Sequence, residues 1–348
     1  MPKLKRGRTE IQKKMEKFIS HPPLLVHTSL SQLRYLILSE GIPVAGNDKR
    51  KRSKRGNLSG GDEVDSGGSE ADTHSQQSIK RLRCYVWSIL SRTSMERCSQ
   101  KYLALLQLGP PETHILQKIK NDTSRTLQTD PKFRAQVSED ALLRCLSCFA
   151  WEIERKKRQA GEGDTVDVSA YVQGMNVLLA PLLYSCPSEA MAYQLFSTMC
   201  KRIIPAYLTR SLAGAQNGAR LLDACLRIVD PKLSKYLGDN LLPAEIYGMP
   251  SILTLSSCNK PLDQVCRLWD FMFAYGFHMN VLFVVAQLVS IRSKIFESES
   301  PMNMLRQLPE FDADEIIRLG VGFVAKIPPD LYDLLIRHLT DPDIVIAE

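Results

Sequence analysis

The stretch KIKNDTSRT, residues 118–126, places an acid and a base at a spacing that suits chemistry. Asp122 and Arg125 stand three residues apart. On a helical turn such residues lie on one face, so the carboxylate can hold the guanidinium in a fixed direction. On its own, this pattern is equally typical of an ordinary surface ion pair.

A second stretch, YVQGMN at residues 171–176, presents an amide in a turn. Gln173 lies between Tyr171 and Gly174. The glycine permits close backbone approach, and Tyr171 together with Met175 can anchor the turn so that the amide faces outward. Taken alone, this glutamine could also cap a helix in the core.

Other catalytic arrangements find little support in the sequence. Cys145 and Cys148 form a CxxC inside an amphipathic segment without a second pair, which favours core packing over zinc. The six histidines are scattered, and no glycine-rich phosphate cradle with its lysine is present. If the protein acts on a nucleotide, we expect another protein to bind that nucleotide.

The elements that must position these residues are predicted to be helices. Apolar residues recur at helical spacing in several segments, and strand alternation is not evident. The segment 138–158 opens with a serine cap and acids and closes with cations, as the helix dipole favours. We therefore predict an all-α, two-lobed, multi-helix architecture. The clearest helical segments are residues 78–92, 138–158, 188–204, 217–229 and 261–276.

Composition and apolar patterning predict an intracellular protein without a membrane span. The 348 residues are 44% hydrophobic, enough for a large core. Nine cysteines without a leading apolar segment indicate a reducing compartment. The longest apolar run, residues 271–289, is interrupted by Gly276 and three polar residues, which favours a buried helix pair over a bilayer span.

Two segments stand apart in charge. We interpret residues 1–32 as a basic arm, because residues 1–19 carry seven cations against two anions. Residues 44–78 lack aromatic residues and are rich in Gly and Ser, so we predict a disordered insertion. Its basic block, residues 49–55, is compatible with nuclear import or phosphate binding. Nucleic-acid binding is a weak alternative because no aromatic residues are interleaved there.

Three frames in fixed order point to a known family. Arg83 and Trp87 form R-x-x-x-W; Ile119, Asp122, Arg125 and Thr126 form I-x-x-D-x-x-R-T; and Tyr171 to Asn176 form Y-x-Q-G-M-N. Together with LWD at residues 268–270, they resemble the TBC domain, the all-helical Rab-type GTPase-activating fold. The resemblance covers about residues 33–340, which leaves residues 341–348 as a tail.

The resemblance implies a mechanism with two fingers supplied in trans. Arg125 would neutralise charge at the transferring phosphate, and Gln173 would polarise the attacking water in place of the GTPase's own glutamine. Asp122 would orient Arg125. Arg83 and Trp87 would brace the first helix, and Tyr171, Gly174 and Asn176 would support the glutamine turn. The chain would need no cofactor of its own, because GTP and Mg²⁺ are carried by the partner, a small Ras- or Rab-like GTPase.

Further segments resemble the fungal mitotic checkpoint members of this family. These are residues 171–196, 240–262 and 268–280. That likeness implies a catalytic subunit that works with a separate scaffold protein at the spindle pole body and restrains mitotic exit and septation. It also implies a cytoplasmic protein, with nuclear access through residues 49–55. The alternative is a catalytically silent TBC-fold scaffold or interaction module.

Overall fold

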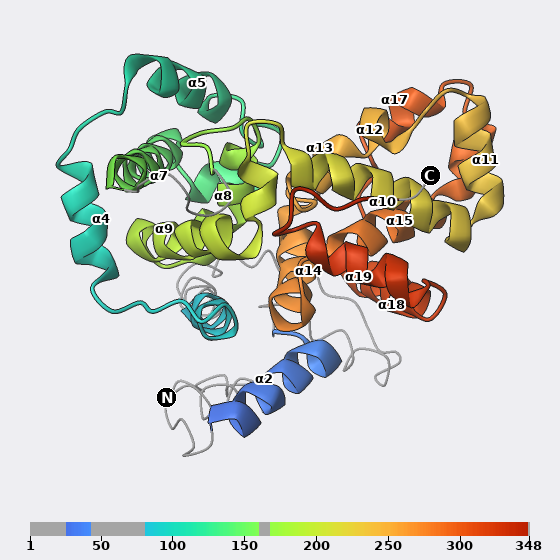
Figure 1. The fold of residues 1–348 in the computed structure, drawn as a ribbon, viewed down its shortest axis with the longest axis horizontal. Helices are drawn as coiled ribbons and strands as arrows, with labels where there is room; N and C mark the ends of the chain where they lie inside the picture. Colours follow the sequence, from blue (N-terminus) through green and yellow to red (C-terminus); the bar gives the residue numbers. More distant parts are fainter. Residues whose placement is uncertain (1–25, 43–80, 160–167, 347–348) are drawn as a thin grey trace, which may run out of the picture.

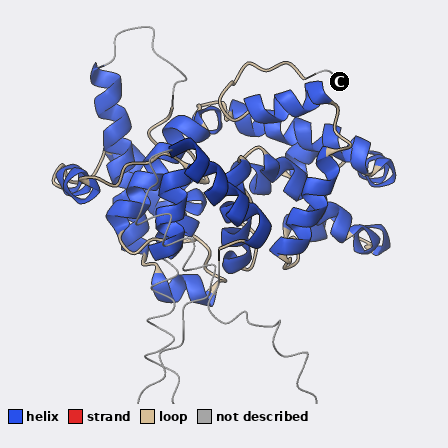
Figure 2. Cartoon of the chain, turned by 90° about the horizontal axis from the view of Figure 1, so that it is seen from below, coloured by secondary structure: helices blue, strands red, loops and turns tan. Residues whose placement is uncertain are grey.

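The computed structural model describes residues 26–42, 81–159 and 168–346. Every regular element in these ranges is a helix, which confirms the all-α prediction (Figures 1 and 2). Most of the predicted arm lies outside the described residues. The same holds for the whole predicted insertion and for residues 160–167. No helix in the described ranges is both long and apolar enough to cross a bilayer.

The helices form two lobes, as predicted (Figure 1). In the amino-terminal lobe, α7 packs against α4, α5, α8 and α9. Its elements are a helix over residues 81–90, α4 (Cys98–Leu106), α5 (Thr113–Thr123), α6 (Pro131–Gln136), α7 (Glu139–Gln159), α8 (Met175–Ser185), α9 (Glu189–Thr198) and the π-helix η2 (Met199–Ile203).

In the carboxyl-terminal lobe, α10 is the helix around which the others gather, and it contacts α11, α12, α13, α15 and α19. The elements of this lobe are the 3₁₀-helix η3 (Pro205–Leu208), α10 (Ala213–Val229), α11 (Pro231–Asp239), α12 (Ala244–Tyr247), α13 (Met249–Leu253), α15 (Met279–Ser290), α16 (Arg292–Glu297), α17 (Pro301–Arg306), α18 (Ala313–Val324) and α19 (Pro329–Arg337).

Local sequence signals account for the ends of α7. The Ser138 hydroxyl accepts a hydrogen bond from the Ala141 amide at 3.1 Å, which caps the helix. Acids occupy its first turn and three cations its last turn, which matches the helix dipole. Cys145 and Cys148 are buried in the core, as their spacing inside an amphipathic helix predicts.

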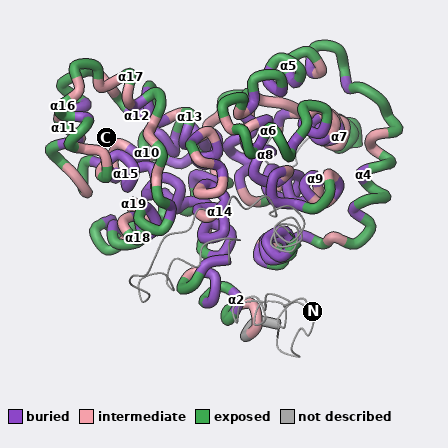
Figure 3. The backbone as a smooth tube through the Cα atoms, turned by 180° about the vertical axis from the view of Figure 1, so that it is seen from behind, coloured by how far each residue is buried: buried purple, intermediate pink, exposed green. Residues whose placement is uncertain are grey.

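The apolar run at residues 271–289 forms a buried helix pair, as predicted. It covers the end of α14 (Leu262–Tyr275) and most of α15. Gly276 separates the two helices with φ +154°, and a Cβ there would lie 2.5 Å from the His278 ring. The break therefore requires glycine, and α14 is buried along most of its length (Figure 3).

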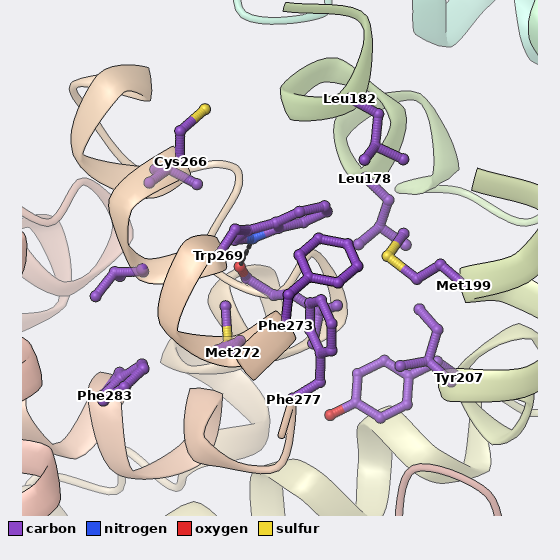
Figure 4. Packing of buried hydrophobic residues seen from close by; sticks show 14 of the residues in the cluster. Leu178, Leu182, Met199, Tyr207, Cys266, Trp269, Met272, Phe273, Phe277 and Phe283 are labelled. Atoms are coloured by element: carbon purple, nitrogen blue, oxygen red, sulfur yellow. Dashed lines mark hydrogen bonds between the residues drawn. The ribbon is translucent and has the colours of Figure 1, made fainter. Parts of the chain in front are cut away.

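Aromatic packing along α14 joins the two lobes. Trp269, Phe273 and Phe277 lie together, with Leu178 and Met199 of the amino-terminal lobe beside them (Figure 4). The Phe273 and Phe277 ring centroids are 4.9 Å apart. Because these three rings are buried between the lobes, they fix how the lobes sit against each other. We call this contact between the lobes the seam.

The two ends of the described chain pack onto this framework. The helix α2 (Val26–Glu40) spans the expected boundary between arm and domain at residues 32 and 33, and it lies against α14. Leu33 and Ile37 belong to the core. At the other end, the Asn217 side chain of α10 donates a hydrogen bond to the Pro342 carbonyl at 3.1 Å, and Ile344 is buried.

Candidate functional site

Arg125 lies directly after α5, in the turn that follows the helix. Asp122 occupies the last turn of α5, and its Oδ1 pairs with Nη2 of Arg125. The Asp122 side chain is 8% exposed, whereas the Arg125 side chain is 63% exposed. A buried acid therefore binds one terminal nitrogen of an exposed guanidinium, and this geometry differs from that of an ion pair in which both side chains are exposed.

Asp122 is also held from the segment that carries the glutamine. The Tyr171 hydroxyl donates a hydrogen bond to Asp122 Oδ2 at 2.6 Å. Burial and the neighbouring Asp122 carboxylate raise the pKa of Tyr171, so its hydroxyl stays protonated and remains a donor. Each carboxylate oxygen thus has a partner, one leading to Arg125 and the other to the turn before α8.

A second set of buried hydrogen bonds fixes the same two segments. The Asn176 side chain donates to the Asp122 carbonyl at 3.2 Å and to the Thr126 hydroxyl at 2.9 Å. Thr126 in turn donates to the Asp122 carbonyl at 2.9 Å. Thr126 belongs to the I-x-x-D-x-x-R-T frame, which by itself predicts no role for it. The signal in the sequence was a threonine directly after Arg125, because a short hydroxyl side chain can hydrogen-bond to a nearby backbone carbonyl within a turn.

Gln173 lies in the turn that leads into α8, and its side chain is exposed. Gly174 follows with φ +96°, a conformation that favours glycine, and its carbonyl accepts the amides of Val177 and Leu178, each at 3.0 Å. The turn therefore stays tight at the start of the helix. Because Tyr171 binds Asp122, the structure links the Gln173 turn directly to the Arg125 turn.

Arg83 and Trp87 lie apart from this exposed site, in the seam between the lobes. The Arg83 guanidinium donates two hydrogen bonds to the Asp270 carboxylate, each at 3.0 Å, and the Trp87 indole donates to the same carboxylate at 2.9 Å. Burial lowers the pKa of Arg83, but the attraction of Asp270 and the hydrogen bonds to it, together with the nearby Cys266 and Asp263, outweigh burial, so the pKa is raised. The residues join the helix at 81–90 to α14.

Asp270 is the last residue of LWD at residues 268–270, and the sequence alone predicts no partner for it. Its carboxylate is fully buried and serves both residues of the R-x-x-x-W frame. The signal available in the sequence was an aspartate within an apolar helical segment, because a charge that becomes buried requires a partner. Within the described ranges, no group of His, Cys, Asp or Glu side chains is arranged to hold a metal ion.

The helical fold and the sequence together identify the family of this chain. The sequence profile of the Rab-GTPase-TBC domain matches residues 80–296, and the chain belongs to this family. The expected family resemblance is thereby confirmed.

Relatives that cover nearly the whole chain are cell-division proteins by name. The mitotic check point protein BUB2 of Saccharomyces cerevisiae is 66% identical over 95% of this chain and 99% of its own length. Cell division control protein 16 of Schizosaccharomyces pombe is 35% identical over 95% of each chain.

Two solved structures have a similar fold. The Ypt/Rab-GAP domain of Gyp1p is 15% identical and aligns with a TM-score of 0.57, covering 72% of this chain and 91% of that domain. The Chlamydomonas flagellar RabGAP TBC domain is 17% identical with a TM-score of 0.54, covering 98% and 97% respectively. At this level of identity the likeness concerns the fold.

Proposed function

We propose that this chain is a GTPase-activating protein that supplies Arg125 and Gln173 in trans to a small Ras- or Rab-like GTPase. The observation that carries the proposal is the arrangement around Asp122. This buried acid holds the exposed Arg125 through one oxygen and receives Tyr171, from the Gln173 segment, on the other. One buried group therefore holds the exposed Arg125 side chain and links its turn to the segment that carries Gln173.

The chemistry requires little more from this chain. GTP hydrolysis needs charge neutralised on the transferring phosphate and a water held in line, and an arginine supplied in trans is typically worth about 10³ to 10⁵ in rate. Because Asp122 already restricts the Arg125 side chain, less freedom is lost when the partner binds. We infer that the partner GTPase carries GTP and Mg²⁺ and that this chain has no cofactor of its own.

The cellular role that we propose is restraint of mitotic exit and septation. The names of the two fungal relatives, a mitotic check point protein and a cell division control protein, support this role. In this proposal the chain is the catalytic subunit of a two-component activator. A separate scaffold protein recruits it from the cytoplasm to the spindle pole body, and residues 49–55 allow nuclear access.

The test is single-turnover GTP hydrolysis by a small Ras-like GTPase of the mitotic exit network, with and without the scaffold subunit. We expect Arg125→Ala to lower the stimulated rate by about 10³-fold or more and Gln173→Ala to remove most of the stimulation. Binding to the GTP-loaded GTPase should persist in both variants. Arg306→Ala, an exposed arginine of α17 in the other lobe, is the matched control and should act like wild type.

The alternative is a silent scaffold of the same fold, and the same experiment separates it. If Arg125→Ala and Gln173→Ala bind the GTPase and match wild type in hydrolysis, the chain is an interaction module. In that case the pair of Asp122 and Arg125 is structural only.

A further inference from the structure

The glutamine turn is supported from a second side by the segment at residues 251–259, which begins within α13 and continues beyond its end. Leu253, the last residue of α13, lies against the turn. A Cβ on Gly174 would lie 3.2 Å from Leu253 Cδ2 and 3.7 Å from Thr254 Cγ2. The residue that follows Gln173 is therefore in close reach of this segment, and the missing side chain of Gly174 permits the approach.

The 251–259 segment does not follow a regular backbone path. Leu255 and Ser256 have φ of +50° and +63°, so two consecutive residues with side chains adopt the left-handed conformation. This conformation is unfavourable for such residues and persists only where the surroundings hold it. The segment is therefore fixed by contacts from outside itself.

Asn280 of α15 supplies two of these contacts and is fully buried. Its Nδ2 donates to the Ser251 carbonyl at 3.1 Å, and its Oδ1 accepts the Ser256 hydroxyl at 2.7 Å. The two bonds hold the segment on either side of Leu253. A further bond, from the Trp269 indole to the Leu255 carbonyl at 2.9 Å, fixes the strained turn from α14.

We propose that Leu253 and Asn280 are positioning residues for Gln173: Asn280 fixes the 251–259 segment, and Leu253 transmits that position to the turn at Gly174. The inference rests on the proposed function, because it assumes that Gln173 acts on the partner's nucleotide. Arg125 has its own buried support in Asp122, so loss of Leu253 affects the glutamine without removing the arginine. A small displacement of a catalytic group lowers rate without abolishing binding.

The first test is Leu253→Ala in the single-turnover assay. A misplacement of about 1 Å can cost about 10²-fold in rate. We expect a smaller effect here, a fall of about 10-fold in kcat with KM unchanged. Leu253→Met, which conserves volume, should restore the rate. In a Gln173→Ala background, Leu253→Ala should cause no further loss, because the group that it positions is already absent.

Ser256→Ala and Asn280→Leu test the second step, and Ser256→Ala removes only one hydroxyl. Both should lower kcat in wild type and have no effect in the Gln173→Ala background. Asn217→Leu is the matched control, because Asn217 is also a buried asparagine with a backbone partner, but it contacts the Pro342 carbonyl instead. It should leave kcat unchanged.

The outcomes separate this inference from the proposed function. If Gln173→Ala stimulates GTP hydrolysis by the GTPase as well as wild type does, the proposed function fails in its assignment of Gln173. If Gln173 matters but Leu253→Ala and Ser256→Ala are silent, only the positioning inference fails. It also fails if these variants lower kcat equally in the Gln173→Ala background, or if Asn217→Leu lowers kcat to the same extent.

Discussion

At the scale of single residues, Tyr171 joins the turn of Arg125 to the segment that carries Gln173 through its bond to Asp122. Tyr171→Phe removes the donor to Asp122 Oδ2 and leaves the ring in place. We expect a loss of about 1.5–3 kcal/mol in the free energy of unfolding, because the bond is made to a carboxylate. We also expect the stimulated hydrolysis rate to fall by roughly 10-fold, because Asp122 then aims Arg125 less well. Urea unfolding and single-turnover hydrolysis measure the two effects.

Tyr193→Phe is the control for that experiment. The Tyr193 hydroxyl donates to Glu152 at 2.6 Å, so it also binds a carboxylate, but it joins α9 to α7 instead of the two turns. It should cost similar stability and leave the stimulated rate unchanged. Equal losses of rate in both variants would mean that Tyr171 contributes to stability alone.

Functional residues that can be predicted from the sequence differ from those that cannot in how local their contacts are. Arg125 and Gln173 stand out because each is a polar side chain in a short frame of neighbours. Leu253 and Asn280 do not stand out, because their roles depend on contacts with segments that are distant in the chain. Periodicity gives the face on which a residue lies, but it does not give its partner across the core.

At the scale of elements, the buried pair of Arg83 and Asp270 holds the helix at residues 81–90 against α14. Asp270→Ala leaves the Arg83 charge buried without its carboxylate, and we expect a loss of about 3–5 kcal/mol in the free energy of unfolding. Denaturant unfolding measures it. Asp239→Ala breaks an exposed pair with Lys235 and should change stability by less than about 1 kcal/mol. Similar losses in the two variants would contradict this account.

Helices were easier to predict than the way they pair. The ends of α7 follow from a cap and from charges that are local in sequence, so the predicted and observed bounds agree within one residue. The contact between Arg83 and Asp270 joins residues 187 apart in the chain. No local pattern encodes such a pairing, and only the family frames suggested that both ends matter.

At the scale of the whole molecule, two buried histidines tie α19 to the rest of the carboxyl-terminal lobe. His338 Nδ1 donates to the Leu335 carbonyl at 2.6 Å, so its Nε2 accepts the Tyr207 hydroxyl of η3 at 2.9 Å. His278 lies 3.0 Å from the Tyr332 hydroxyl of α19. Burial lowers the pKa of each histidine to about 4, so both are neutral in the folded protein at pH 7.

The lowered pKa values make the stability of the fold sensitive to mild acid. An unfolded histidine has a pKa of about 6.5, so between about pH 6.5 and pH 4 the unfolded chain binds protons that the folded chain does not. Stability should therefore fall as the pH drops through that window, by roughly 2 kcal/mol per histidine between pH 7 and pH 5. Urea midpoints at the two pH values measure it. His338→Gln keeps an acceptor for Tyr207 but does not titrate. On acidification from pH 7 to pH 5, this variant should therefore lose roughly 2 kcal/mol less stability than wild type. If wild type and His338→Gln lose equal stability between pH 7 and pH 5, the buried His338 does not set the acid limit of the fold.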